Sequence, residues 1–301
     1  TGVTTGSLAT ATALTSLQKV LNQKLNIKNV DIITPTKTLN IIIKSCKLLS
    51  KNKAESSSVK YPYNDPDVTV GLDIVSTVEL YDKTDQFEEN IQIYGGKGVG
   101  IITKPGLQIP VGEAAINPIP QKMIKENLEK ILPSNKVAKV IISIPKGEEI
   151  SSKTMNPRLG IVNGISILGT TGIARPMDNT AYKNSIVTQI DVAIAEKVEN
   201  LVFVPGNIGE KLALKDLNIR KEEIIQTGNF IGFMFEEAKK RGINSFTLFG
   251  HIGKLVKLAG GIFNTKHAVA DGRCEIFAAH TALVGCEKEV IVKIFEAKTT
   301  E

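Results

Sequence analysis

The chain has 301 residues, of which 42% are hydrophobic and 23% are charged, and its mean hydropathy is +0.02. This length is enough for about two domains, the composition excludes a disordered chain, and no apolar run reaches the roughly 20 residues that span a bilayer. The net charge is +6, but basic residues are not interleaved with aromatic ones and tryptophan is absent, which argues against a nucleic-acid-binding protein.

The three cysteines, Cys46, Cys274 and Cys286, form no CxxC pair, which favours a reducing compartment. No charged segment followed by an apolar one marks a secretion signal. We therefore expect a cytoplasmic protein with no membrane partner. Its basic balance is compatible with a polyanionic small molecule.

The first 94 residues predict one helix followed by several strands. Apolar residues at 9, 13, 17, 21 and 25 recur at every fourth position, which makes one face of a helix whose N-cap is Thr4 or Thr5. The serine-rich stretch 51–60 is polar and is expected to form a loop. Apolar alternation bounded by turn signals predicts strands at 30–34, 38–44, 68–80 and 91–94.

An unusual loop follows at 95–120, with the sequence GGKGVGIITKPGLQIPVGEAAINPIP. Its six glycines and four prolines exclude a long helix, while its apolar side chains argue against a floppy linker. Ordered loops of this length are usually functional, and a purely structural Ω-loop is the alternative. A helix at 121–132 and a buried strand at 137–144 complete a first domain, which we expect to end near residue 150.

A second glycine-rich stretch runs from 156 to 177 and reads NPRLGIVNGISILGTTGIARPM. Its short apolar run, 165–168, leads directly into Gly169, Thr170, Thr171 and Gly172. A buried strand that runs into a Gly/Thr loop and then a helix is one way in which α/β proteins build a pocket for a polar or anionic ligand. A tight turn without a ligand is the alternative.

Beyond residue 150, four short apolar strands each end on a glycine, at Gly169, Gly206, Gly228 and Gly250. Helix-like sequence follows them, most clearly from 179 and from 229, and a final strand is expected at 289–295. Alternating strands and helices predict a parallel sheet, whose ligands bind at the carboxyl ends of the strands. The predicted class is α/β, with a mixed α+β domain at 1–150 and a Rossmann-like domain with a mostly parallel sheet at 151–301.

Motifs for several common chemistries are missing. There is no GxxxxGK[ST] phosphate loop, no HExxH metal motif and no nucleophile elbow, and no helix follows the glycines of 95–100 as a dinucleotide fingerprint requires. We expect no metal site from the scattered His251, His267 and His280. Acid–base candidates, each with a cap or loop role as the alternative, are Asp65, Asp67, Glu113 and Asp271.

Six segments carry a resemblance to a known family. They read TGVTTGSLATATA at the N-terminus, the 95–120 and 156–177 stretches quoted above, VFVPGNIGEKLA at 202–213, GHIGKLVKLAGGIFNT at 250–265 and ADGRCEIFAAHTAL at 270–283. With these motifs, which extend over nearly the whole chain, the sequence resembles the CbiD methyltransferases of the anaerobic cobalamin pathway. The resemblance implies transfer of a methyl group from S-adenosylmethionine to C-1 of cobalt-precorrin-5B, which gives cobalt-precorrin-6A.

The resemblance implies two ligands, a sulfonium methyl donor and a large cobalt corrinoid edged with acetate and propionate groups. We expect the donor at the carboxyl ends of the second domain's strands, against Gly169, Thr170, Thr171, Gly172, Gly206, Asn207, Gly250 and His251. The alternative role of Asn207 is the N-cap of a helix that begins near Glu210. We expect the corrinoid between the domains, against Lys104, Gly106, Glu113, Asn117, Arg158 and Arg175, since Arg and Lys bind carboxylates. A salt bridge within the chain is the alternative for each arginine.

The macrocycle carbon itself would attack the methyl group, so no side-chain nucleophile is required, and no catalytic acid or base is assigned. Two other functions are compatible with the same architecture. One is a non-enzymatic corrinoid carrier, and the other is a nicotinamide-dependent oxidoreductase, which the missing fingerprint disfavours. The sequence does not decide between a monomer and a homo-oligomer.

Overall fold

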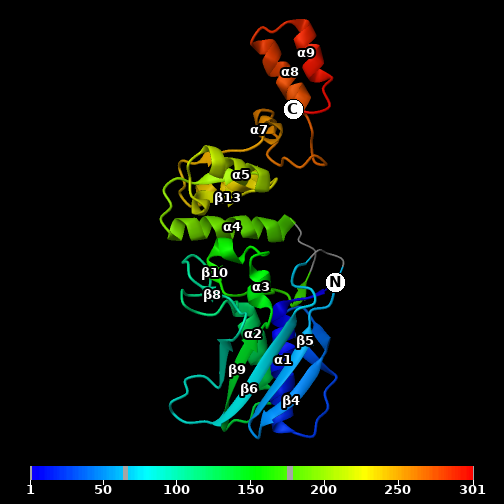
Figure 1. Ribbon diagram of the computed structural model, residues 1–301, viewed down its shortest axis with the longest axis vertical. Coiled ribbons are helices and arrows are strands. Elements are labelled where there is room, and N and C mark those ends of the chain that lie inside the picture. Colours follow the sequence, from blue (N-terminus) through cyan, green and yellow to red (C-terminus); the bar gives the residue numbers. More distant parts are fainter. Residues whose placement is uncertain (1, 64–66, 175–178, 301) are drawn as a thin grey trace. The chain divides into compact units, whose positions relative to one another are not determined.

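The computed structural model describes residues 2–63, 67–174 and 179–300 (Figure 1). The chain forms two compact units, Thr1–Asp178 and Asn179–Glu301. The division therefore lies after the 156–177 stretch and not near residue 150, because that stretch pairs with strands of the first unit. Strand β10 (Ile161–Val162) is antiparallel to β8 (Ile101–Ile102), and β11 (Ile173–Ala174) is antiparallel to β1 (Gly2–Val3).

The first unit is built on a five-stranded mixed sheet with the order β4-β5-β6-β9-β7. Strand β7 is parallel to β9 and the other neighbours are antiparallel, which confirms the mixed sheet predicted for this half of the chain. Strands β2 and β3 form a separate hairpin close to the predicted positions. The bounds are β2 Asn29–Ile33, β3 Thr38–Ile42, β4 Ser45–Ser50, β5 Lys53–Val59, β6 Asp73–Asp82, β7 Ile91–Gly95 and β9 Lys136–Ser143.

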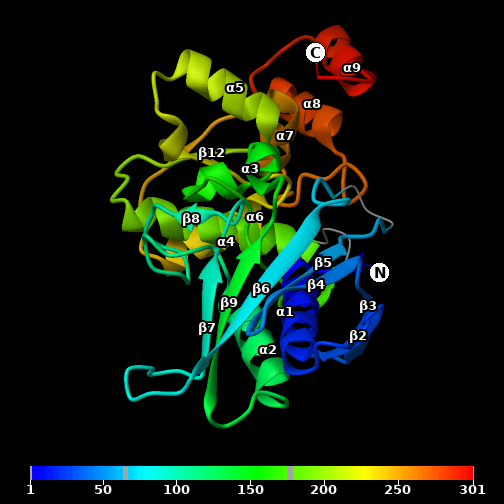
Figure 2. The same cartoon turned by 60° about the horizontal axis from the view of Figure 1, so that its bottom comes forward.

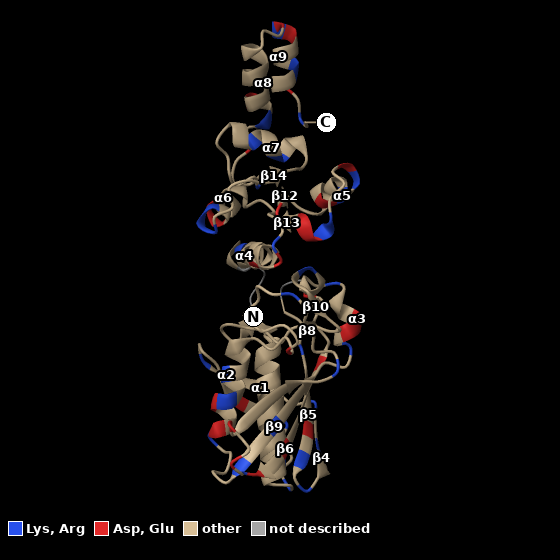
Figure 3. Ribbon diagram, turned by 90° about the vertical axis from the view of Figure 1, so that its left-hand side faces the viewer, with Lys and Arg blue, Asp and Glu red and all other residues tan. Residues whose placement is uncertain are grey.

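Helix α1 (Thr5–Leu21) is the centre of this unit, and it packs against the sheet beside α2 (Pro118–Glu129), as Figure 2 shows. Thr4 is its N-cap and accepts a 3.1 Å hydrogen bond from the Ser7 amide, as predicted. The helix carries one charged residue, Lys19, so Figure 3 shows it almost wholly uncoloured, whereas α2 carries charges of both signs. Residues 5–17 of α1 are all buried.

Strand β5 corrects the prediction of a loop at 51–60. Its serines are polar but buried, and they bond to neighbouring elements. The Ser16 hydroxyl of α1 lies 2.8 Å from both Ser56 Oγ and the Ser76 carbonyl oxygen, and the Ser58 hydroxyl donates to the Ile42 carbonyl at 2.7 Å. Small hydroxyl side chains let the helix lie close to the sheet, and their hydrogen bonds offset the cost of burying them.

Backbone hydrogen bonds join the 95–120 loop to the 156–174 stretch. Gly100 N donates to Ile165 O at 3.0 Å, Ile165 N to Gly98 O at 3.1 Å, and Ile167 N to Ala115 O at 2.8 Å. A side chain on Gly98 (φ 74°) would overlap the Ile144 carbonyl, so this glycine permits a close approach of backbones. After β9 the chain passes through the short helix α3 (Gly147–Ser151), and a 3₁₀ turn at Asn156–Leu159 begins the 156–174 stretch.

The second unit contains a three-stranded parallel sheet with the order β13-β12-β14, which confirms the predicted parallel arrangement. Phe203 and Ile225 pack with α4 and α6 on one face, while Val202 and Val204 pack with α5 on the other. The bounds are α4 Asn179–Ala195, β12 Val202–Val204, α5 Asn207–Asp216, β13 Ile224–Gln226, α6 Ile231–Lys240, β14 Thr247–Leu248, α7 Ile252–Ala259, α8 Arg273–Leu283 and α9 Lys288–Phe295.

Two predicted strands of the second domain are not strands of this sheet. The run 165–168 lies in the first unit, where it forms only isolated bridges to the 95–120 loop. The stretch 289–295 is helix α9, because packing against α8 outweighs the strand preference of its β-branched residues. Among the described residues, no helix combines the length and the apolar character needed to cross a bilayer.

Candidate functional site

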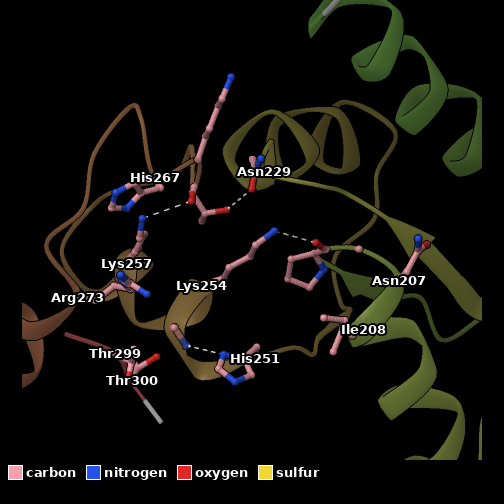
Figure 4. Close-up of a pocket in the computed structure, with 16 residues that line it drawn as sticks. Asn207, Ile208, Asn229, His251, Lys254, Lys257, His267, Arg273, Thr299 and Thr300 are labelled. Atoms are coloured by element: carbon pink, nitrogen blue, oxygen red, sulfur yellow. Dashed lines mark hydrogen bonds between the residues drawn. The ribbon is translucent and has the colours of Figure 1, made fainter. Parts of the chain in front are cut away.

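A pocket of about 780 Å³ opens in the second unit where β12 and β14 end (Figure 4). This is the edge at which ligands bind in parallel α/β sheets, and the sequence predicted a site there. Four turns or helix ends meet around it: the β12–α5 turn, the start of α7, the 265–267 loop and the start of α8. The lining residues are Pro205, Gly206, Asn207, Ile208, Gly209, Asn229, His251, Gly253, Lys254, Lys257, Thr265, Lys266, His267, Arg273, Thr299 and Thr300.

The turn after β12 forms one wall. Gly206 has φ 131° and is the N-cap of α5, and a side chain at this position would project into open space. The first amide groups of a helix have no partner within the helix, so those of α5 are available to a ligand. Asn207 is the first residue of α5, so it is not the N-cap that was the alternative to a ligand contact. Its Oδ1 accepts a 2.8 Å hydrogen bond from Gln226 Nε2.

The start of α7 forms a neighbouring wall. His251 is the N-cap of this helix, and its Nδ1 accepts a 3.3 Å hydrogen bond from the Gly253 amide. Gly250 packs against the ring of Pro205, where a side chain would come within 2.6 Å of Pro205 Cδ. The predicted donor residues Gly206, Asn207, Gly250 and His251 thus meet at one edge of the sheet, and all but Gly250 line the pocket.

Lysines of α7 and the start of α8 give the pocket its charge. Lys257 is 3% exposed and donates to the Ala270 carbonyl at 2.7 Å, while Lys254 Nζ donates to the Pro205 carbonyl at 3.0 Å. Burial lowers the pKa of Lys254, and the nearby Lys257 charge lowers it further. Hydrogen bonds from the Arg273 guanidinium hold the pKa of Asp271 well below its usual range.

Two of the acidic candidates have structural partners. Asp271 accepts from Arg273 Nε and Nη2 at 2.7 and 2.9 Å, and its Oδ2 lies 2.8 Å from His267 Nδ1. Asp67 is bound by Lys60 and Thr69, Glu113 is exposed, and Asp65 lies outside the described residues. Within the described ranges, no group of three His, Cys, Asp or Glu side chains could hold a metal ion.

The Gly169–Gly172 loop belongs to the first unit and packs against the N-terminus of α1. The Gly6 amide donates to the Leu168 carbonyl at 3.0 Å, and the Ser7 hydroxyl donates to the Gly172 carbonyl at 2.6 Å. Gly169 and Gly172 have φ angles of 139° and 80°, and side chains there would overlap Thr4 and Thr34. Packing thus accounts for both glycines, and Thr170 and Thr171 lie between them.

The described residues that were predicted to touch the corrinoid all lie in the first unit. The side chain of Lys104 packs over Gly160, two residues after Arg158, and the Thr103 amide and hydroxyl both donate to the Gly160 carbonyl, at 2.8 and 2.6 Å. Asn117 is the N-cap of α2. Gly106 and Glu113 are exposed on the same long loop, and Arg175 lies outside the described residues.

Several lining residues were missed by the sequence prediction, above all Lys254, Lys257, Lys266 and Arg273. A signal was present, because 252–259 reads IGKLVKLA and places two lysines three residues apart, on one side of a helix that follows a glycine-ended strand. These lysines lie on the helix that follows the glycine-ended strand, whereas the prediction placed the ligand against the strand's end.

Comparisons with known proteins cover nearly the whole chain. The CbiD family model matches residues 1–176, and the model of the CbiD C-terminal domain matches residues 264–301. Over 301 residues the chain is 64% identical to a Methanobrevibacter smithii protein named cobalt-precorrin-5B C(1)-methyltransferase, and 52% identical to one of that name from Methanosphaera stadtmanae. All of this chain is covered in both comparisons, together with 83% and 78% of those proteins.

Among solved structures, the chain is similar to a cobalamin biosynthesis protein, cbiD, from Archaeoglobus fulgidus. The sequences are 22% identical, the match covers 88% of this chain and 80% of that one, and the TM-score is 0.43.

Proposed function

The chain belongs to the CbiD family, and we propose that it is a methyltransferase that methylates C-1 of cobalt-precorrin-5B. The observation that carries this proposal is 64% identity, without loss of any part of the chain, to a protein of that name. Identity at this level over both units favours the methyltransferase over the two alternative functions, a corrinoid carrier and a nicotinamide-dependent oxidoreductase.

S-adenosylmethionine is the proposed methyl donor, and its proposed site is the β12–α5 side of the pocket, against Gly206, Asn207, Gly250 and His251. The open space beside Gly206 supports a ligand that approaches the backbone, and the first amides of α5 suit the donor's carboxylate. A cavity of about 780 Å³ is within the usual size of ligand pockets. Gly169, Thr170, Thr171 and Gly172 are left out of this proposal because packing in the first unit accounts for their loop.

For the corrinoid, the proposal retains Lys104 and Arg158, whose positive charges suit the carboxylates at its edge. Gly106, Glu113 and Asn117 belong to the same segment of the first unit and remain proposed neighbours. No role is proposed for Arg175 on structural grounds.

The chemistry requires orientation more than activation. The corrinoid carbon attacks the donor's methyl group, the new carbon–carbon bond forms as the sulfur–carbon bond breaks, and the sulfonium leaves as a neutral thioether. Holding the two reacting atoms in line at about 3–3.5 Å supplies most of the lowering of the activation barrier that such a step needs. Exclusion of water from the pocket protects the donor from side reactions.

Transfer is tested by mixing the purified protein with cobalt-precorrin-5B and S-adenosylmethionine that carries a CD₃ group. The expected result is a corrinoid product that carries the deuterated methyl group at C-1, together with S-adenosylhomocysteine, as found by mass spectrometry and NMR. Binding of the corrinoid without transfer would indicate a carrier. Product formation only with NAD(P) would indicate an oxidoreductase.

A further inference from the structure

The pocket has two chemically different sides (Figure 4). At one end, Asn207 and Ile208 present an amide and an aliphatic side chain. At the other end lie Lys257, Arg273 and His267, and Lys254 extends between the two ends toward the Pro205 carbonyl. Lys266 is exposed and also lines the pocket. We call Lys254, Lys257, Lys266 and Arg273 the basic side.

The basic side has more positive charge than the described residues around it neutralise. Asp271 is shared by Arg273 and His267, and its Oδ1 lies 3.7 Å from Lys257 Nζ. Lys254 donates to the Pro205 carbonyl oxygen, and the shortest hydrogen bond of Lys257 is to the Ala270 carbonyl oxygen. Neither carbonyl group carries a net charge. None of the described lining residues is Asp or Glu.

Burial makes this excess charge unfavourable in the empty pocket. Lys257 is 3% exposed, and the lowered pKa of Lys254 reflects its burial beside a second ammonium group. Charges removed from water are stabilised when an ion of opposite sign binds them, and the gain is larger than it would be at an exposed surface. The basic side therefore fits an anionic group.

We propose that the basic side binds the carboxylate side chains of the corrinoid acceptor, next to the methyl donor on the other side of the same pocket. This inference rests on the proposed function. The donor is a poor match for the basic side, because its sulfonium and ammonium groups outnumber its single carboxylate. The acceptor carries several acetate and propionate groups, and lysines hold carboxylates as point charges without a fixed geometry.

This placement brings donor and acceptor into one pocket in the second unit. A methyl donor seated against the α5 amides directs its carboxylate into the β12–α5 turn and leaves the remainder of the cavity to the edge of the corrinoid. Methyl transfer needs the two reacting atoms within about 3–3.5 Å, which a shared pocket allows.

The test compares two stable corrinoid probes by absorbance titration: dicyanocobyrinic acid, whose side chains are free carboxylates, and dicyanocobinamide, whose side chains are amides. Variants are Lys254→Met, Lys266→Gln and the double variant, with Lys254→Arg as the variant that keeps the charge. The matched control is Lys239→Gln, since Lys239 is an exposed lysine of α6 outside the pocket.

The natural protein should bind the acid more tightly than the amide, and salt should weaken the difference. Lys254→Met should weaken binding of the acid by about tenfold or more, and the double variant should weaken it further. Lys254→Arg and Lys239→Gln should bind the acid as the natural protein does. Calorimetry should find that Lys254→Met does not weaken donor binding, because the donor's proposed contacts are the α5 amides and loss of a nearby positive charge does not disfavour a cation.

The inference is overturned if the natural protein binds both probes equally, or if the folded double variant binds the acid as the natural protein does. It is also overturned if Lys254→Met weakens binding of the donor alone. Failure of the proposed function is seen separately, as absence of methyl transfer by the natural protein to cobalt-precorrin-5B.

Discussion

The pair of Asp67 and Lys60 should make the stability of the first unit depend on pH. Asp67 Oδ2 accepts hydrogen bonds from Lys60 Nζ at 2.5 Å and from the Tyr63 hydroxyl at 2.9 Å, while its Oδ1 accepts from the Thr69 amide at 2.8 Å. The side chains of Lys60 and Asp67 are 7% and 16% exposed. The perturbation is Asp67→Asn, which keeps the shape and removes the charge.

The magnitude follows from the pKa of Asp67, which is lowered from 3.8 to about 2. Burial acts to raise this pKa, but hydrogen bonds from Lys60 and Thr69 outweigh it. One pKa unit corresponds to about 1.4 kcal/mol, and discounting for partial solvent screening leaves about 1–2 kcal/mol of stabilisation at neutral pH. Because the folded pKa is depressed, this stabilisation is present above the unfolded pKa near 3.8 and is lost as the pH falls through about 2.

In Asp67→Asn the buried Lys60 charge also loses its partner, so the total cost at pH 7 should be about 2–4 kcal/mol. Hydrogen exchange followed by mass spectrometry measures the local free energy of opening in β5 and β6 separately from the second unit. The control is Asp82→Asn, whose side chain is 83% exposed and pairs with Lys136 at 2.6 Å, and which should change stability by less than about 1 kcal/mol. The reasoning fails if both variants cost the same, or if the effect of Asp67→Asn does not shrink between pH 5 and pH 2.

Three further predictions concern glycines and the core. Gly172→Ala, at φ 80° and against Thr34, should lower the free energy of unfolding by more than about 1 kcal/mol in thermal denaturation, yet leave the donor affinity of the folded protein unchanged. Gly206→Val should fill the space beside the α5 amides and weaken donor binding by more than about tenfold in calorimetry, with circular dichroism as the check that its strained φ of 131° leaves the fold intact. Phe203→Ala should destabilise the second unit by about 3–5 kcal/mol in chemical denaturation, because this ring is fully buried and lies 4.9 Å from the Phe246 ring.

Hydrophobic periodicity predicted most elements of both units. A helix or strand with one buried face has apolar residues that recur with the repeat of that element. The hairpin β2–β3, the strand β9 and the helix α4 lie where this pattern placed them. Strand β5 was missed because its buried residues are serines, whose hydroxyls bond to Ser16 and to the Ile42 carbonyl. Composition does not separate a serine that faces water from one whose partner lies on another element.

The boundary between the units depended on contacts that no local pattern encodes. The run 165–168 has the composition of a parallel strand and ends on a glycine, as β12 does. The run 165–168 differs from β12 in its pairing partner, because it forms bridges to the 95–120 loop, which is distant in the sequence. Likewise, a glycine at a strand's end is equally consistent with a ligand, as proposed at Gly206, and with packing, as at Gly172 against Thr34.

The charges around the pocket bear on the methyl transfer that we propose there. The donor enters with a sulfonium charge, and in the transition state part of that charge has moved toward the acceptor as the sulfur becomes a neutral thioether. If the donor binds as proposed, repulsion between its sulfonium and Lys254 is greatest in the bound donor and declines along the reaction, which favours the transition state over the ground state. Acceptor carboxylates seated on the basic side would offset the same charges and strengthen binding of the donor. The donor would then bind more tightly after the corrinoid, so corrinoid first is the order that the electrostatics support.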